Sequence, residues 1–131
     1  MARVTVVNDN PEFLELMGEV LQGERHAAVT IDADGDDLVD RIRDSDPDLL
    51  ILDVRAAGSE EDRALEVARR VREMTGDDRL PILLCSADLL ALDELRPAVA
   101  SLDCMAVLAK PFGIDELTEA IDRLLAIRSG R

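Results

Sequence analysis

Hydrophobic residues gather in five short runs spaced along the chain. Each run is almost continuous and lacks the strict alternation of polar and apolar positions that marks a half-exposed strand. Continuous apolar runs of strand length are typical of strands buried on both faces, as in a parallel sheet covered by helices. The five runs are Val4–Val7, Ala27–Ile31, Leu49–Leu52, Ile82–Cys85 and Met105–Ala109.

The segments between the first four runs show the spacing of amphipathic helices. Asn10 can cap the first helix, Pro11 suits its first position, and Gly23 favours its end. Ser59 and Asp62 resemble a capping box at the start of the third helix. The expected inward faces are Phe13, Leu16, Met17, Val20 and Leu21 in the first helix, Leu38, Val39 and Ile42 in a second helix over Asp34–Arg43, and Leu65, Val67, Ala68, Val71 and Met74 in the third, which ends near Gly76.

Two further helices are expected in the last third of the chain. Pro97 predicts a break or kink near Arg96, or a new helix starting at Pro97, because proline does not fit a helix interior. The alternation of strands and helices predicts one α/β domain, a parallel sheet with helices on both faces. The expected final helix covers Ile114–Ile127 and turns Leu117, Ile121, Leu124 and Leu125 inward.

Composition and charge narrow the function classes. Hydrophobic residues make up 47% of the 131 residues, which is ordinary for a globular domain. The formal net charge of −14 repels phosphate backbones and anionic lipids, so we expect no direct binding to nucleic acid or membranes. No apolar run reaches membrane-spanning length and no leader precedes the first run, so a cytoplasmic protein is expected.

Two cysteines, Cys85 and Cys104, lie in or beside apolar runs that should form neighbouring parallel strands. Their offset along those strands is roughly 16 Å at ~3.3 Å per residue. A disulfide needs Cα atoms within about 7 Å of each other. The sequence therefore predicts two free, buried thiols.

Polar residues follow four of the five runs. Asn8 and Asp9 follow the first, Asp53 the third, Ser86 the fourth, and Lys110, which is the only lysine, the fifth. In open α/β sheets, ligands bind beyond the carboxyl ends of the strands, so these side chains should converge. Carboxylates there can bind Mg²⁺, and one of them can act as a nucleophile. A hydroxyl and an ammonium can stabilise phosphoryl oxygens.

Four segments in this order and spacing resemble the response-regulator receiver family, whose members are CheY-like. The resemblance covers nearly the whole length. It implies a single doubly wound, flavodoxin-like (βα)5 domain over residues 1–128, with a five-stranded parallel sheet of order 2-1-3-4-5 and a C-terminal tail at 129–131. The segments are Val6–Pro11, Leu49–Val54, Leu83–Ala87 and Leu108–Phe112.

The resemblance also implies roles for the strand-end residues. Asp53 would be the phospho-acceptor, Ser86 would hydrogen-bond the phosphoryl group, and Lys110 would form a salt bridge to it. The peptide bond before Pro111 would be cis, as is usual in this family.

The implied cofactor is Mg²⁺ or Mn²⁺. Its ligands would be Asp9, Asp53 and the backbone carbonyl of Arg55, with Asn8 acting weakly through a water. The side chains of Arg55 and Asp88 would flank the phosphoryl group, pair with each other and slow its loss.

The chain departs from the family pattern at three places. Asn8 replaces the usual first acidic residue, which removes one negative charge and should weaken Mg²⁺ binding. Arg55-Ala56-Ala57-Gly58 stands where Met-Pro is common. Val107 occupies the aromatic switch position, so any conformational signal must use other parts of the Asp88–Leu102 region.

The function implied is that of a two-component receiver and not of an enzyme. Asp53 would take a phosphoryl group from a histidine kinase or histidine phosphotransfer protein, and phosphorylation would switch binding to a downstream effector protein. No output domain is expected in this chain, and a homodimer is an open alternative. A pseudo-receiver, an interaction module that is not phosphorylated, is favoured by Asn8 and Val107. A haloacid-dehalogenase-like phosphatase is disfavoured because Asn8–Pro11 lacks an Asp-x-Asp pair.

Overall fold

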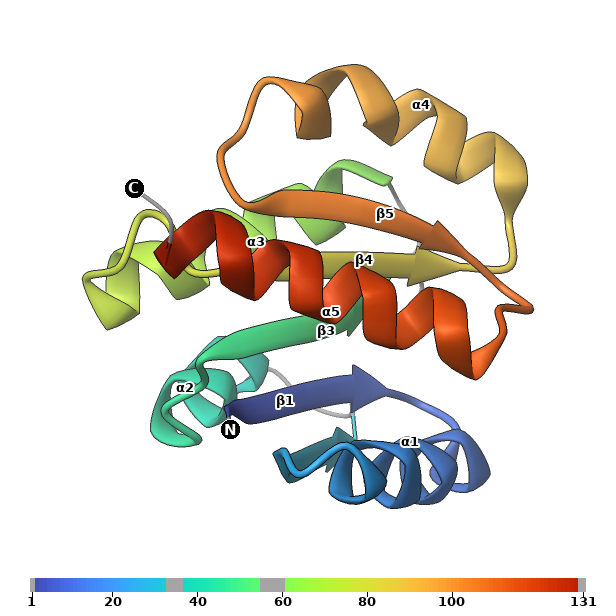
Figure 1. Cartoon of the computed structure of the whole chain (residues 1–131). Helices are drawn as coiled ribbons and strands as arrows, with labels where there is room; N and C mark the ends of the chain where they lie inside the picture. The colour runs from blue at the N-terminus through green and yellow to red at the C-terminus, as the bar shows by residue number, and fades with distance from the viewer. Residues whose placement is uncertain (1, 33–36, 55–60, 130–131) are drawn as a thin grey trace.

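Strands and helices alternate along the whole chain (Figure 1). The computed structural model describes residues 2–32, 37–54 and 61–129. The strands are β1 (Arg3–Asn8), β2 (Ala27–Asp32), β3 (Leu49–Asp53), β4 (Ile82–Ser86) and β5 (Met105–Ala109), and the helices are α1 (Pro11–Gly23), α2 (Leu38–Asp44), α3 (Glu61–Thr75), α4 (Leu89–Ala100) and α5 (Ile114–Ser129).

The five strands form one parallel sheet in the order β2-β1-β3-β4-β5. The predicted fold class and strand order are therefore confirmed. The chain adds β2 on one side of β1 and then crosses to place β3 on the other, so the order reverses between β1 and β3. The carboxyl ends of these two central strands are where a ligand is expected in a sheet of this kind.

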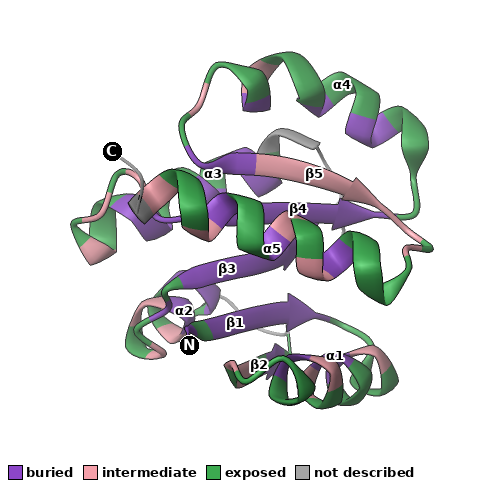
Figure 2. Cartoon of the chain, in the orientation of Figure 1, coloured by how far each residue is buried: buried purple, intermediate pink, exposed green. Residues whose placement is uncertain are grey.

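Two hydrophobic clusters lie on opposite faces of the sheet. One cluster packs α1 and α5 against the sheet, and the other packs α2, α3 and α4. Figure 1 shows α5 crossing in front of the strands and α3 behind them. Figure 2 shows β1, β3 and β4 buried, while β5 at the edge is mostly half-buried. The prediction of buried parallel strands covered on both faces is confirmed.

Helix α1 begins as predicted, but its buried face differs from the prediction at Leu14 and Leu16. The Asn10 side chain caps the helix by accepting from the backbone N–H groups of residues 12 and 13. Leu14, Met17 and Leu21 are buried, whereas Leu16, predicted to face inward, is 55% exposed. Leu14 and Leu16 are both apolar, and periodicity alone could not decide which of the two faces the sheet.

The second and third helices confirm most of their predicted inward residues. Helix α2 buries its three predicted residues, and the predicted start at Asp34 lies outside the described residues. The proposed capping box cannot be compared with the structure, because Ser59 lies outside the described residues. Helix α3 ends before Gly76, which has a φ of +71°, as predicted. Met74 was wrongly predicted to be inward, because it is 41% exposed.

Arg72 takes a buried position near the end of α3 that was not predicted. It is only 8% exposed, and its guanidinium donates to the carbonyl oxygens of Leu80 (2.8 Å) and Asp103 (2.6 Å). These bonds tie α3 to the segments that lead into β4 and β5. Burial lowers the pKa of Arg72 from its ordinary value.

Helix α4 is one continuous helix through Pro97, so the prediction of a break or of a new helix there is wrong. Proline removes one backbone hydrogen bond, to the carbonyl of Asp93. Pro97 and Asp93 both lie on the exposed side, where water can bind that carbonyl. Buried residues on either side of the proline, Leu95 and Val99, hold the helix on the sheet.

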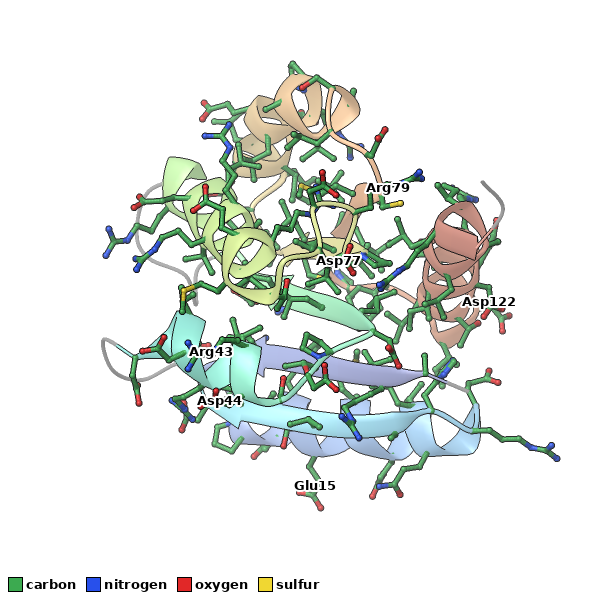
Figure 3. The ribbon with its side chains drawn as sticks, turned by 90° about the vertical axis from the view of Figure 1, so that its left-hand side faces the viewer. Glu15, Arg43, Asp44, Asp77, Arg79 and Asp122 are labelled. Carbon is green, nitrogen blue, oxygen red and sulfur yellow. The ribbon has the colours of Figure 1, made fainter. Side chains whose placement is uncertain are left out.

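Helix α5 extends past its predicted end. Its predicted inward residues are buried except Leu125, which is half-buried. Arg128, expected near the boundary with a frayed tail, is helical. It forms an ion pair with Asp77 and donates to the carbonyl of Asp48 (3.2 Å). Figure 3 shows Asp77 and Arg79 on the loop between α3 and β4.

Both cysteines are free and buried, as predicted. Within the described ranges, none of the helices has both the length and the apolar character needed to cross a bilayer.

Candidate functional site

Asp53 ends the central strand β3 and is the buried charge at the carboxyl edge of the sheet. It is 7% exposed. Its Oδ2 atom forms an ion pair with the Nζ of Lys110, at the end of β5, and accepts from the Nδ2 of Asn8 (3.1 Å), at the end of β1. Three of the predicted site residues are thus brought into direct contact, and two donors stabilise the negative charge of Asp53.

Asn8 uses both ends of its amide. Its Nδ2 donates to Asp53, and its Oδ1 accepts from the backbone N–H of Asn10 (2.8 Å). Asn8 is 2% exposed. A side chain predicted to act on a metal-bound water therefore contacts the Asp53 carboxylate directly, and it also anchors the start of α1.

Asp9 follows Asn8 and is exposed. Among the described residues, no hydrogen bond or ion pair engages its carboxylate. An aspartate in this position, open to solvent beside the end of β1, is available to a cation.

Ser86 ends β4 and is 1% exposed. Its carbonyl accepts from the backbone N–H of Lys110 (2.9 Å), so these two predicted residues lie on adjacent strand ends. Its Oγ accepts from the backbone N–H of Asp88 (3.0 Å), which leaves the hydroxyl proton for donation elsewhere.

Asp88 caps α4, a contact that the sequence did not predict. Its Oδ1 accepts from the backbone N–H groups of Leu90 and Ala91, both at 3.1 Å. This hydrogen bonding orients the carboxylate toward the start of the helix. Arg55, its predicted partner and a predicted metal ligand, lies outside the described residues.

Lys110 also contacts an aromatic ring. Its Nζ lies 4.3 Å from the centroid of the Phe13 ring, and Phe13 meets Phe112 edge to face with centroids 6.2 Å apart. The peptide bond between Lys110 and Pro111 is cis, as predicted. Phe13 was predicted only as a core residue of α1. The one signal in the sequence was that both aromatic residues of the chain fall near strand-end motifs.

Val107, at the position expected to hold a switch aromatic, is half-buried on β5. It packs against the hydrophobic cluster that includes the inward residues of α4. Its branched side chain therefore contributes to packing on the α4 side of the sheet.

Cys85 lies beside the site. It pairs with Asp53 in the β3–β4 register and is 1% exposed. Burial raises the pKa of its thiol to about 12, with the Asp53 charge adding to the rise and Lys110 opposing it. The thiol is therefore neutral at ordinary pH, and it is not a candidate nucleophile.

An apolar hollow of about 390 Å³ opens next to Lys110. Side chains from the outer part of α1 form one wall, and the start of α5 with the segment before it forms the other. The residues that line it include Phe13, Leu16, Val20, Phe112, Ile114 and Leu117.

The site's oxygen donors fit a magnesium ion that keeps several of its waters. Such an ion is usually bound through one or two protein carboxylates, and Asp53 and Asp9 supply that number. The described residues contain no cluster of three or more His, Cys, Asp or Glu side chains that could hold a metal. Carboxylate oxygens are the ligands that a hard cation such as Mg²⁺ prefers.

The comparisons with known proteins agree on one family. The family model described as the response regulator receiver domain matches residues 4–122. The response regulator MprA of Mycobacterium avium is 37% identical over 125 residues, which cover 94% of this chain and 50% of that protein. The chain thus spans about half the length of the curated relatives it matches.

Solved structures share the fold. A response regulator receiver domain protein from Clostridium thermocellum superposes with a TM-score of 0.78 at 19% identity, covering 98% of each chain. The receiver domain of a sensor histidine kinase from Pseudomonas aeruginosa has a TM-score of 0.73 at 23% identity, covering 95% of this chain and 98% of that one. That crystal structure has a magnesium ion coordinated in the active site cleft.

Proposed function

Because this chain belongs to the response regulator receiver domain family, we propose that it accepts a phosphoryl group on Asp53 from a histidine kinase or a histidine phosphotransfer protein. The observation that carries the proposal is the buried Asp53 carboxylate held by the chain's only lysine. A buried carboxylate at the switch point of a parallel sheet, with an ammonium bonded to it, is positioned for nucleophilic chemistry on an anionic group.

In the proposed reaction, an oxygen of Asp53 attacks the phosphorus of a phosphohistidine. A P–O bond forms, the P–N bond breaks, and its electron pair returns to the imidazole nitrogen. Lys110 keeps its proton and moves from a carboxylate oxygen toward a phosphoryl oxygen, which stabilises the charge that arrives there. The Ser86 hydroxyl, whose oxygen accepts from the backbone N–H of Asp88, donates a hydrogen bond to a second phosphoryl oxygen and keeps its proton.

Asp9 and Asp53 would hold Mg²⁺ or Mn²⁺, with Asn8 contributing weakly through a water and the Arg55 carbonyl, outside the described residues, as a further ligand. When bound, the ion neutralises phosphoryl oxygens during transfer. The direct bond between Asn8 and Asp53 supports weaker metal binding, because an amide donor stands where a second buried carboxylate would attract the ion.

Phosphorylation would change the affinity of this domain for a downstream effector protein or for a second copy of the chain. Val107 cannot act as an aromatic rotamer, so the change would pass through the segment that joins β4 to α4. There Ser86 is hydrogen-bonded to the residue that caps the helix. The output of a longer protein that contains this domain would then depend on its other half. We expect a cytoplasmic regulator that binds neither nucleic acid nor membranes through this chain.

A pseudo-receiver is the second candidate, and Asn8 favours it. The amide of Asn8 and the ammonium of Lys110 both contact one oxygen of Asp53, where the family pattern has an acidic residue in place of Asn8. In this reading the contact is structural and the domain binds its partners in one state.

Incubation with acetyl phosphate, followed by intact mass measurement, separates the two candidates. A receiver gains the mass of one phosphoryl group with Mg²⁺ and does not gain it with excess chelator. A pseudo-receiver gains none under either condition. Asp53→Asn, which keeps the size of the side chain, is the matched control and should remain unmodified throughout.

A further inference from the structure

The chain has two phenylalanines and no tyrosine or tryptophan; Phe13 contacts its only lysine, and Phe112 contacts Phe13. Phe13 presents its ring to the Lys110 ammonium at 4.3 Å, within the range of a cation–π interaction. Phe112 contacts Phe13 edge to face, with an interplanar angle of 82°. Edge-to-face packing of this kind restrains the orientation of a ring.

We propose that Phe13 is a positioning residue for Lys110: the Phe13 ring holds the Lys110 ammonium against Asp53 and fixes the ammonium for phosphoryl binding. The part of this inference that concerns phosphorylation rests on the proposed function. The part that concerns the position of the ammonium rests on the contacts alone.

The contacts form a closed circuit of five residues that begins and ends at Asp53. Asp53 accepts from Asn8, Asn8 accepts from the backbone of Asn10, and the Asn10 side chain accepts from the backbone N–H of Phe13 (3.4 Å). The Phe13 ring then meets Lys110, which forms the ion pair with Asp53. The start of α1 is therefore tied to the acceptor carboxylate through both backbone and side chain.

This arrangement addresses a problem that is specific to lysine. An ammonium on a four-carbon stem has many rotamers, and ordering it costs entropy. Lys110 is only partly buried, so solvent competes for its three N–H groups. A ring face on one side removes water from that side and limits the directions in which the ammonium can point.

A purely structural role would make Phe13 a filler of the apolar hollow beside α1. The two roles differ in what a substitution must preserve. A filler needs apolar volume, which leucine supplies. A positioning ring needs a π face, which tyrosine keeps and leucine lacks.

The single lysine makes a direct test available. In protein labelled with isotopes at lysine, all lysine side-chain signals come from Lys110. Its ε-methylene protons should be shifted upfield from those of free lysine, because they lie near a ring face. Phe13→Leu should abolish the shift, Phe13→Tyr should keep it, and Leu16→Ala, which changes another apolar side chain of the same hollow, should leave it unchanged.

Several results would overturn the proposal. Wild-type protein with an unshifted Lys110 signal would refute the contact without any variant, so a failure of Phe13→Leu to fold cannot protect the idea. Retention of the shift in Phe13→Leu, or its loss in Leu16→Ala, would assign the effect to another group.

The reaction gives a second readout. Phe13→Leu should slow phosphorylation of Asp53 by acetyl phosphate up to about five-fold, the size expected for an exposed cation–π contact. Phe13→Tyr and Leu16→Ala should react at the wild-type rate. An unchanged rate in Phe13→Leu would overturn the link to phosphoryl transfer. If wild-type protein takes no phosphoryl group, the proposed function fails, while the Lys110 signal still tests the positioning.

Discussion

Replacing Asn8 by aspartate tests how the departure from the family pattern shapes the site. The substitution removes the amide N–H that donates to Asp53 and puts a carboxylate in its place, at a position that is 2% exposed. Two unit charges 3.1 Å apart repel by roughly 5 kcal/mol at an effective dielectric constant of about 20. The ammonium of Lys110, which contacts Asp53, offsets part of this repulsion.

Protonation sets an upper limit to the cost. A carboxyl with an ordinary pKa near 3.9 takes up a proton at pH 7 for about 4 kcal/mol, so the pair can escape a larger repulsion in this way. We therefore expect Asn8→Asp to lower the free energy of unfolding at pH 7 without metal by about 2–4 kcal/mol. For a domain of this size, each kcal/mol corresponds to roughly 3–4 °C in Tm.

The dependence on pH and on metal identifies the cause. The introduced carboxyl would have a folded-state pKa above its unfolded value, so its penalty should be full at neutral pH and shrink as the pH falls toward 4. Mg²⁺ should bind between the carboxylates, and a tenfold gain in affinity would add up to about 1.4 kcal/mol at saturating metal. Magnesium should therefore stabilise the variant more than the wild type.

Urea unfolding at pH 7 and pH 5, each with and without Mg²⁺, measures all of these quantities. Asn8→Ala is the control, because it removes the same hydrogen bond without adding a charge; its loss of stability should be similar at pH 7 and pH 5, and magnesium should not stabilise it more than the wild type. Equal behaviour of the Asp and Ala variants in all four conditions would refute the electrostatic reasoning.

Three further outcomes follow from the contacts of single residues. Amine reagents should modify Lys110 more slowly than the N-terminal amine, and beryllofluoride with Mg²⁺, a phosphoryl mimic, should slow the modification of Lys110 further in peptide mass mapping. If Lys110 reacts as fast as the N-terminal amine and the mimic does not slow it, Lys110 is not part of the site. Burial raises the pKa of the Cys85 thiol to about 12, so thiol reagents at neutral pH should label Cys85 no faster than the chain unfolds, and rapid labelling of the native protein would contradict its burial. The free energy of unfolding should fall as the pH rises from about 9 to 12, and Cys85→Ala should remove this dependence on pH. Arg72→Met should lower the free energy of unfolding by about 2–3 kcal/mol in urea, because the carbonyls of Leu80 and Asp103 lose a charged donor, and a neutral effect would show that water replaces it.

The parallel sheet was predictable from five apolar runs of strand length separated by segments with helical spacing, whereas its strand order was implied by the resemblance to the receiver family. The structure places every predicted strand within a residue or so of its expected ends. The wrong predictions, of which residues are buried and of a break at Pro97, arose where the packing of a helix overrides the local sequence pattern. Leu14 and Leu16 are equally apolar, and only the docking of α1 decides which one is buried. Pro97 breaks a propensity rule, but α4 continues through it as one helix, because Pro97 and Asp93, whose carbonyl loses its backbone donor, both lie on the exposed side.

The candidate site was predictable to the level of strand ends. Asp53, Ser86 and Lys110 follow apolar runs, so the topology alone brings them to one edge of the sheet. The partners that complete the site were not predictable, because they depend on side-chain direction. The donation from Asn8 to Asp53 and the contact between Phe13 and Lys110 follow from how α1 begins and packs, which no spacing in the sequence encodes.

The central claim is that Asp53 is the phospho-acceptor, and reductive trapping tests it most directly. The protein is incubated with acetyl phosphate and Mg²⁺, reduced with borohydride, which converts an aspartyl phosphate to homoserine, and digested for peptide mass mapping. We expect homoserine at position 53, its absence when Mg²⁺ is chelated, and no trapped residue in Asp53→Asn. Homoserine at Asp9 or another aspartate with residue 53 intact, or equal trapping in Asp53→Asn, would contradict it.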